Sequence, residues 1–386
     1  MTGRTERHAN AAASARQALT SIADIPAPQW NDLATRVAEP NGYYLADWER
    51  MVSASARGRT DAFALLGTAA ADQTRLIGLL PVISLWNAYK IPLPALVTAD
   101  PYGALGTPLL DRTAANIAAA SLLNEARRAG ARALILRDLP LEGEAFKAFQ
   151  TALANEGLKP RVLTSHARAC LDATQDAEQI LRDSLGSKKL KELRRQRNRL
   201  ADVGEVRFDV ARTPEQVATA LETFLALEAS GWKAERGTAL LQHEGDAAFI
   251  RTASVALAAR GQCEVISLHA GETPVAAAVV LRHQDRAFYF KLGVDETSAR
   301  FSPGVQVTLE LTRYLCADPA IGMADSTAKA GHSMIDPIWR GRLRIGDVFI
   351  PLRRHDPMIA IIRAALVFRR LIREPARRVV HFIRKH

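Results

Sequence analysis

Apolar and polar positions alternate in a way that divides the chain into two runs of similar elements. In the first half, a helical pattern at 47–56 precedes two apolar stretches, 61–67 and 75–83, which a polar turn joins into a predicted β-hairpin. The pattern then predicts a helix, a strand, a second helix and an extended segment, at 112–129, 133–137, 142–156 and 161–171 in turn. Helices and strands therefore mix along this half of the chain.

The second half repeats this order of elements. Two predicted helices come first, at 214–230 and 246–260. Three predicted strands follow, at 263–269, 274–281 and 287–294. The half ends with a helix at 303–317, a short apolar strand at 321–324 and a final strand at 347–351. Its hairpin follows the first one by about 200 residues. The repeat predicts a duplicated α/β unit, and hairpins joined through helices predict a mixed sheet with helices on its faces.

Composition places the chain among ordinary globular proteins. Its 386 residues are 48% hydrophobic and 24% charged, which suffices for about two domains with their own cores. The three cysteines are far apart and in no metal-ligand spacing, so we predict reduced thiols, no metal site and a cytoplasmic protein. We expect no secretory signal in the polar N-terminus, and the longest uncharged apolar stretch, 76–86, is too short to span a bilayer.

The net charge of +10 is concentrated in two segments. Residues 187–199 hold seven basic residues and one acidic residue, and residues 353–386 hold ten basic and two acidic residues. The rest of the chain carries 34 basic and 38 acidic residues, so its net charge is slightly negative. This distribution does not favour nucleic acid as the partner, because a nucleic-acid-binding protein extends its basic surface over the body.

One segment of the second half carries the clearest chemical pattern. An apolar strand ends at Gly293, a polar loop follows, and a helix begins at Ser302, Pro303 and Gly304. Serine is a favoured N-cap and proline a favoured first helical residue, and small residues there leave backbone N–H groups open to an anion. Arg300 adds a cation just before this helix. The segment is either an anion site or an ordinary well-capped helix.

This strand, loop and Ser-Pro-Gly helix start resemble the acyl-CoA-binding element of GNAT acyltransferases, in the branch called FemAB-like or CelD-like. Three further segments resemble the same branch. They are a basic helix with the strand after it (185–210), a segment containing Ser-Gly-Trp-Lys (224–238), and a segment that runs from Ala-Asp-Ser-Thr to Pro-Ile-Trp (324–339). The resemblance covers about 170–352 and, more loosely, about 30–165. It implies two tandem GNAT-like lobes.

We therefore predict an α/β protein with a mixed α+β sheet, built from two tandem GNAT-like lobes and a basic helical tail. We predict four segments. They are a disordered leader (1–20), an N-terminal lobe without a cofactor (21–168), a C-terminal acyltransferase lobe (169–352) and a basic amphipathic helix (353–386).

The resemblance implies that acetyl-CoA or another acyl-CoA binds as co-substrate through Arg300, Ser302, Gly304 and Val305. The loop departs from the usual GNAT pattern, because it retains one glycine and places Val305 where a small residue is common. In the first lobe the matching helix start carries Asp111. A carboxylate there would repel phosphate, so we assign the cofactor to the second lobe alone.

Direct attack of an amine on a thioester needs a neutral amine, a polarised carbonyl and a proton for the leaving thiolate. The resemblance implies that the strand at 288–294 supplies a polarising N–H group. We place Tyr289, Asp325 and His332 around the reaction as catalytic candidates. Each has a structural alternative: sheet packing for the tyrosine, a loop or cap for the aspartate, and packing or capping for the histidine.

The predicted acceptor site combines Glu228 and Trp232, which are one helical turn apart, with Lys291 on the strand. A core tryptophan with a surface glutamate is the alternative for the first two. The acceptor itself is predicted to be an amine of a small molecule, a sugar or an envelope precursor.

The two basic segments allow several interpretations. The helical segment 187–200 is a solvated amphipathic helix, a cationic wall of the acyl-CoA cleft, or a tRNA contact, although it has no aromatic residues for stacking on RNA.

In the tail, an apolar stripe lies beside arginines that recur every seven residues. The apolar stripe consists of Met358, Ile361, Ala365, Phe368 and Ile372. Residues 358–386 therefore suit an anionic membrane surface, or a helix docked on the body or on a second copy in a homodimer.

These observations predict an acyl-CoA-dependent N-acyltransferase, in the first place an acetyltransferase, that is cytoplasmic or peripheral to the inner membrane. Two alternatives stay open. One is a Fem-type transferase that uses aminoacyl-tRNA. The other is a non-catalytic accessory protein for exopolysaccharide or cellulose production.

Overall fold

The computed structural model describes residues 19–69, 72, 74–230 and 237–383, with side chains in the last helix as far as Ile372. Trp232 lies outside the described residues. So does the predicted leader, except for its last two residues, and Thr20 already belongs to the first strand.

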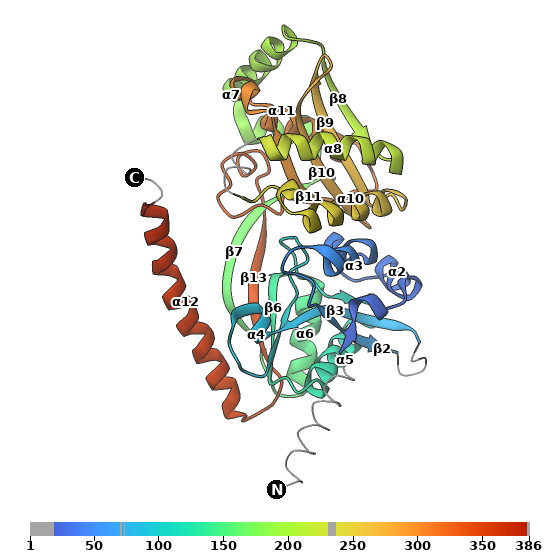
Figure 1. Ribbon diagram of the computed structural model, residues 1–386, viewed down its shortest axis with the longest axis vertical. Helices are drawn as coiled ribbons and strands as arrows, with labels where there is room; N and C mark the ends of the chain where they lie inside the picture. Colours follow the sequence, from blue (N-terminus) through green and yellow to red (C-terminus); the bar gives the residue numbers. More distant parts are fainter. Residues whose placement is uncertain (1–18, 70–71, 73, 231–236, 384–386) are drawn as a thin grey trace.

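One mixed sheet runs the length of the molecule (Figure 1). Its strands follow the order β1-β2-β3-β4-β6-β13-β7-β12-β11-β10-β9-β8, with β5 paired to β3. Their bounds are β1 Thr20–Ser21, β2 Phe63–Thr68, β3 Leu76–Ser84, β4 Ala95–Thr98, β5 Leu109–Leu110, β6 Ala133–Pro140, β7 Arg161–Asp172, β8 Val206–Ala211, β9 Cys263–Ala270, β10 Thr273–His283, β11 Arg286–Val294, β12 Met323–Asp325 and β13 Gly341–Pro351. The predicted mixed α/β fold is confirmed.

Helices cover both faces of this sheet. They are α2 Ala27–Thr35, α3 Ala46–Ser55, α4 Leu85–Tyr89, α5 Ala115–Arg128, α6 Glu144–Asn155, α7 Ala177–Ala201, α8 Pro214–Ser230, α10 Glu244–Ala258, α11 Pro303–Cys316 and α12 Pro357–Ile383, with short 3-10 helices η1 Ile22–Asp24, η2 Gly42–Tyr44, η3 Leu240–Gln242 and η4 Glu296–Phe301. Residues of β10 alternate between two cores: Ala276 and Ala278 face the core that contains α7 and α11, while Ala277 and Val279 face the core that contains α8 and α10.

The two halves of the sheet repeat one arrangement, as the hydrophobic pattern predicts. An antiparallel hairpin, β2–β3 or β9–β10, is followed by a parallel pair, β4–β6 or β11–β12, whose strands are connected through α5 or α11. We call the half that contains β2 to β6 the first lobe, and the half that contains β8 to β12 the second lobe.

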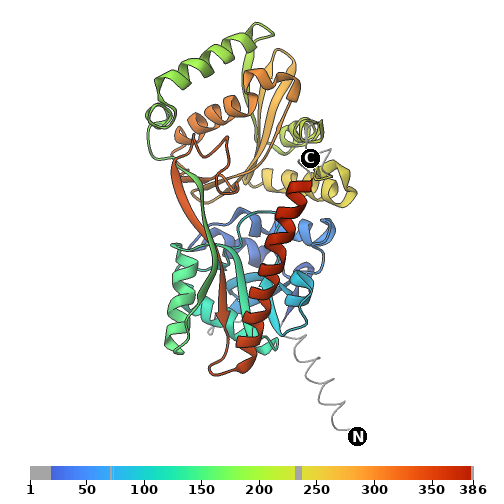
Figure 2. The same cartoon turned by 90° about the vertical axis from the view of Figure 1, so that its left-hand side faces the viewer.

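Two long antiparallel strands, β7 and β13, join the lobes (Figure 2). β13 also pairs with β6 of the first lobe, from Ile345 to Pro351, whereas β7 pairs with β12 of the second lobe from Cys170 to Asp172. The predicted boundary between residues 168 and 169 therefore falls inside β7. The last strand also starts earlier than its apolar run at 347–351 indicates, because its first residues alternate arginines with apolar residues.

An aromatic cluster and a close helix contact pack the lobes against each other. Trp48 of α3 lies edge-on to Phe249 of α10 and to Phe290 of β11, with ring centroids 4.9 and 5.0 Å apart. Where α3 ends, Gly245 of α10 lies so close that a Cβ atom on it would be 2.1 Å from the Ser55 carbonyl oxygen. Glycine at this position therefore permits the contact between α3 and α10.

We expect Gly245→Ala to lower the free energy of unfolding by about 1–3 kcal/mol, because the added methyl group forces the two helices apart. Gly322→Ala is the matched control: its Cβ would meet no atom closer than 3.5 Å. The measurement is urea denaturation followed by tryptophan fluorescence. Equal stability of the two variants would contradict the close contact.

Candidate functional site

The second lobe opens where β11 and β12 separate. The two parallel strands pair only over Arg286–Phe288 and Met323–Asp325, and β11 then continues to Val294 without β12 beside it. On its other edge, where it pairs with β10, β11 carries a β-bulge. Lys291 and Tyr289 pair with consecutive residues of β10, so Phe290 between them has no partner on β10. Bulges of this kind are common beside active sites, where they turn the backbone of a strand toward a ligand.

A pocket of about 390 Å³ occupies this divergence. It is lined by the end of β11, the segment after β12 and the loop that follows, namely Tyr289, Phe290, Lys291, Leu292, Val294, Ser326, Thr327, Ala328, His332, Met334 and Ile335. At its inner end the Thr327 hydroxyl donates to the Tyr289 carbonyl oxygen at 2.7 Å. Three residues predicted from the sequence, Tyr289, Lys291 and His332, therefore lie together here.

The start of α11 borders the same pocket. Gly304 is buried, and a Cβ atom on it would lie 3.1 Å from Leu292 Cδ2, 3.2 Å from Met334 Sδ and 3.3 Å from Val294 Cγ1. All three neighbours line the pocket. The start of α11 therefore lies next to the pocket. The side chains of Leu292, Val294 and Met334 lie between Gly304 and the open volume.

The backbone at this helix start is unusual. Ser302 has φ of 54° and ψ of 53°, and its side chain does not cap the helix. Its carbonyl oxygen accepts hydrogen bonds from the N–H groups of Val305 and Gln306, each at 3.0 Å. A serine in the left-handed region is costly and persists where surrounding structure or function holds it.

The other two residues predicted for this site lie on either side of Ser302. The Arg300 side chain is exposed and lies over the Phe301 ring, with its Cζ 4.7 Å from the centroid. Val305 packs against the core of the second lobe.

Basic residues of α7 lie beside this helix start. The predicted basic helix forms the second part of α7, after a kink at Gly186. It packs on α11: the Gln306 amide donates to the Leu193 carbonyl oxygen at 2.8 Å, and Arg197 pairs with Glu310 at 2.8 Å. The opposite side of the helix is exposed and carries the cationic residues Lys188, Lys191, Arg194, Arg195 and Arg199.

On its other side the pocket reaches the contact between the lobes. Lys291 Nζ lies 3.0 Å from Oε1 of Glu228, which is fully buried, and the other Glu228 oxygen accepts the N–H of Leu240 at 2.8 Å. Lys291 Nζ also lies 5.6 Å from the centroid of the Tyr102 ring. The Tyr102 hydroxyl donates to Asp246 at 2.9 Å, and burial together with that carboxylate raises the pKa of Tyr102. Two of the predicted acceptor residues therefore form one ion pair.

Asp325 is placed differently from the other candidates. It is buried, pairs with the buried Arg168 of β7, and accepts the N–H of Thr327 at 2.8 Å. It does not line the pocket, and it touches the pocket wall through Thr327. The structure thus gives Asp325 a positioning contact, and a part in proton transfer stays a prediction.

Tyr289 and His332 differ in exposure. The Tyr289 hydroxyl is 3.3 Å from the Thr308 hydroxyl of α11, and burial raises the pKa of Tyr289 to about 12, so the side chain is neutral. His332 is exposed at the mouth of the pocket, and its Nδ1 accepts the N–H of Met334 at 3.3 Å. This bond leaves Nε2 as the ring nitrogen that can face a substrate.

Sequence patterns did not identify Arg168, Tyr102, Thr327 or Met334. Arg168 and Tyr102 reach the site from β7 and from the first lobe, and no local spacing marks such long-range contacts. Thr327 and Met334 lie within the segment 324–339 that the resemblance already covers. The polar side chain of Thr327 near Asp325 and the flexible side chain of Met334 near His332 could have identified these two residues from the sequence.

The corresponding position in the first lobe is filled by its own chain. Gly106 donates its N–H to the Asp138 carbonyl oxygen at 3.2 Å, and its Cβ position is 2.2 Å from the Arg137 carbonyl oxygen, so this loop lies against the edge of β6. The predicted position of Asp111 at the helix start is wrong: α5 begins at Ala115, four residues later, and Asp111 is buried and forms ion pairs with Arg36 and Arg75. The loop at Gly106 therefore covers the edge of β6 in the first lobe, and a carboxylate paired with two arginines precedes its helix.

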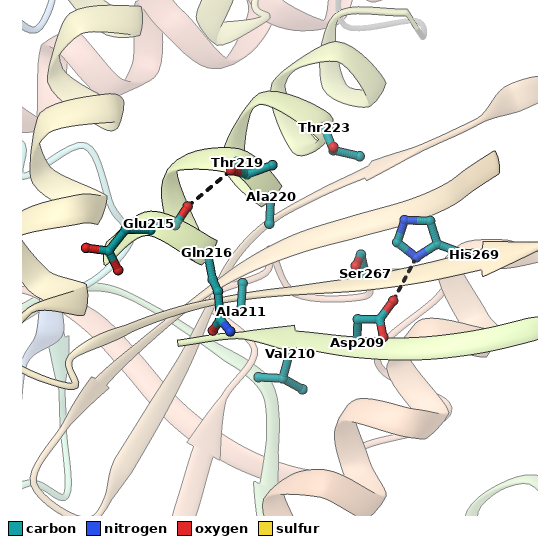
Figure 3. Close-up of a pocket in the computed structure, with 10 residues that line it drawn as sticks. All are labelled: Asp209, Val210, Ala211, Glu215, Gln216, Thr219, Ala220, Thr223, Ser267 and His269. Atoms are coloured by element: carbon teal, nitrogen blue, oxygen red, sulfur yellow. Dashed lines mark hydrogen bonds and ion pairs between the residues drawn. The ribbon is translucent and has the colours of Figure 1, made fainter. Parts of the chain in front are cut away.

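A second pocket, of about 620 Å³, lies between α8 and strands β8 and β9 (Figure 3). Figure 3 shows His269 next to Asp209, with Nδ1 and Oδ2 3.2 Å apart, and the exposed Glu215 at the far side of the pocket. It is larger than the pocket at β11. It lies away from the diverging strands, and the helix start in its lining, the first turn of α8, carries the acidic Glu215, so it does not match an acyl-CoA site.

Metal sites and membrane-spanning helices are both absent from the described residues. These residues contain no cluster of three His, Cys, Asp or Glu side chains that could hold a metal ion. They also contain no helix that is long and apolar enough to cross a membrane.

Comparisons with known proteins agree with this geometry. Residues 187–327 match the family of acetyltransferase (GNAT) domains, and this range includes the second part of α7, the diverging strands and α11. A search of curated proteins gives no match.

Solved structures with the same fold cover most of the chain. FemX shares 11% sequence identity and a TM-score of 0.56, over 84% of this chain and 96% of that one. The C-terminal domain (DUF2156) of a protein described as a lysylphosphatidylglycerol synthetase from Agrobacterium fabrum shares 14% identity and a TM-score of 0.54, over 88% and 96%. A conserved protein of unknown function from Bacteroides thetaiotaomicron shares 13% identity and a TM-score of 0.52, over 86% and 98%.

At these identities the similarity concerns the fold, and the family match adds the acyltransferase domain. The predicted resemblance is thereby confirmed: residues 187–327 are a GNAT acyltransferase domain, and the chain shares its fold with FemX.

Proposed function

We propose that the chain is an acyl-CoA-dependent N-acyltransferase whose donor binds in the pocket between β11 and β12. The observation that supports this most is the position of that pocket, which connects a bulged strand edge with the start of α11. A strand edge can pair with the amide groups of an extended donor, and a helix start can hold its phosphates. Both features lie within the matched GNAT range.

The donor phosphates would lie at the start of α11. The N–H of Gly304 and the positive end of the helix dipole attract an anion, and Arg300 adds a charge nearby. Ser302 and Val305 shape this turn through the carbonyl and N–H groups already described. The exposed cations of α7 extend the positive surface beside it. We propose acetyl-CoA as the donor.

The reaction itself is a direct transfer. The neutral amine attacks the thioester carbon, the C–N bond forms, the C–S bond breaks, and the proton of the amine ends on the thiolate sulfur. Backbone N–H groups of β11 near the bulge at Phe290 polarise the carbonyl, and His332 at the pocket mouth relays the proton. Asp325 acts through Thr327 by holding the segment that closes the inner end of the pocket.

The acceptor amine would approach from the contact between the lobes. Lys291 lines that side of the pocket, and the buried Glu228 and the Tyr102 ring hold its ammonium group from behind. Glu228 therefore acts through Lys291, because both of its oxygens are already paired. Trp232, which lies outside the described residues, stays part of this proposal. The acceptor is proposed to be a small amine, an amino sugar or an envelope precursor.

A Fem-type transferase is the second candidate, favoured by the fold shared with FemX and by the exposed cations of α7. It would take an aminoacyl group from tRNA in place of an acyl group from CoA. The donor that binds in the pocket distinguishes the two, and an accessory protein for polysaccharide production would bind neither.

We predict that the purified chain binds acetyl-CoA in a calorimetric titration, and that Gly304→Glu abolishes the binding. The glutamate adds a negative charge and bulk at the place where the donor phosphates would lie. Thr219→Glu is the matched control, because it puts the same charge on the exposed α8 residue of the second pocket and should leave the affinity unchanged. A thermal melt of each variant shows that it is folded.

Absence of heat with both acetyl-CoA and a longer acyl-CoA, or equal binding by Gly304→Glu, would refute the donor site. Binding of aminoacyl-tRNA without any response to acyl-CoA would support the Fem-type candidate instead. If activity in the cell survives Gly304→Glu, the accessory role gains support.

We predict that Asp325→Asn lowers the free energy of unfolding by about 3–5 kcal/mol, because it leaves the buried Arg168 charge without its partner. Glu222→Gln breaks the exposed pair with Arg251 and should cost less than about 1 kcal/mol. Urea denaturation monitored by circular dichroism measures both. If Asp325→Asn proves as mild as the control, the ion pair does not hold β12 in place.

A further inference from the structure

The C-terminal helix α12 has one face on the body and one face in solvent. Met358, Ile359, Ile362 and Leu366 pack on an apolar cluster of the first lobe formed by α4, β4, β6 and β13. Further along, the Arg369 guanidinium lies 4.1 Å from the centroid of the Tyr89 ring, and Arg370 donates to the Leu163 carbonyl oxygen at 3.1 Å. Figures 1 and 2 show the helix along the outside of the molecule, with its far side uncovered by any described element.

The outer face of α12 is apolar and exposed. Five large apolar side chains of this face are at least half exposed: Ile361 at 51%, Val367 at 54%, Phe368 at 66%, Leu371 at 63% and Ile372 at 55%. Their spacing, together with Ala364 and Ala365, puts them on one side of the helix. Of the stripe predicted from the sequence, Met358 belongs to the inner face instead.

Single exposed apolar side chains are common, but a continuous patch of this kind marks a surface that another molecule covers. Folding leaves these five side chains in water although the inner face of the same helix is buried. The outer face is therefore a candidate interaction surface, which we call the α12 outer face.

Charge decides between the molecules that could cover it. Residues 353–386 hold ten basic and two acidic residues, and Arg363 and Arg370, one heptad apart, flank the α12 outer face. Two copies of this chain would bring two such basic segments together and repel each other. An anionic phospholipid surface instead attracts the arginines and accepts the apolar side chains at the boundary between headgroups and acyl chains.

The short helix α4, which packs beside α12, carries one exposed aromatic side chain. Trp86 is 52% exposed, and Tyr89 on the same short helix contacts Arg369 of α12. Tryptophan next to a basic amphipathic helix is typical of proteins that lie at a membrane interface. The described part of the chain has no membrane-spanning helix, so the contact would be peripheral.

We propose that the α12 outer face binds the protein to membranes that contain anionic phospholipids. This contact lies on the first lobe, away from the pocket at β11, and it does not depend on the acyltransferase proposal. The helix lies in the plane of the surface, with Phe368 and Leu371 inserted and the arginines at the level of the lipid phosphates.

The test is co-sedimentation of the full chain with vesicles of phosphatidylcholine, with and without phosphatidylglycerol. We expect binding to the anionic vesicles, weaker binding as salt rises, and little binding to the neutral ones. The double variant Phe368→Asp with Leu371→Asp should weaken anionic-vesicle binding by about tenfold or more. Ile117→Asp, at a 64% exposed position of α5, is the control and should bind like the unmodified chain.

Thermal melts confirm that the variants are folded, because both substituted residues are exposed in the free protein. Equal sedimentation of the double variant and the unmodified chain would overturn the proposal. So would a homodimer in light scattering without lipid that the double variant dissociates, since the face would then belong to a second copy.

Discussion

The buried ion pair between Arg168 and Asp325 fixes the point at which β11 and β12 separate. Arg168 belongs to β7, the strand through which the second lobe is joined to the first, and its partner is the last residue of β12. A buried charge is stable only beside its counter-charge, so β12 ends where this pair forms while β11 continues for six residues more, from Tyr289 to Val294. The pocket and the exposed strand edge are consequences of that geometry.

The duplication of the fold makes this opening asymmetric. In both lobes a helix connects the two strands of the parallel pair. In the first lobe, however, the loop at Gly106 lies along β6, and Asp111, four residues before α5, is buried and paired with Arg36 and Arg75. The second lobe keeps its opening, and the first lobe contributes the aromatic wall that includes Tyr102. In the proposed function one lobe would supply the donor site and the other would complete the acceptor side, with β7 and β13 joining the two.

Local patterns in the sequence predicted the hairpins, most of the other strands and the helix that begins after Ser302, because alternation, turn residues and capping residues act over a few positions. The resemblance to GNAT acyltransferases named Tyr289, Lys291 and His332, which line one pocket in the structure, and their roles stay a prediction. The sequence could not separate the role of Asp325 from theirs, because its burial depends on Arg168, 157 residues away in sequence. For the same reason the early part of β13 was missed: its arginines look like a loop until β7 pairs with them.

The most direct test of the account is amide hydrogen exchange of the chain with and without acetyl-CoA. If the donor lies along the bulged strand and against the helix start, exchange slows at residues 289–294 and 304–306 and stays unchanged at α8 around the second pocket. Protection confined to α8 and β8, or no protection at all under saturating donor, would contradict the assignment of the divergence between β11 and β12 as the donor site.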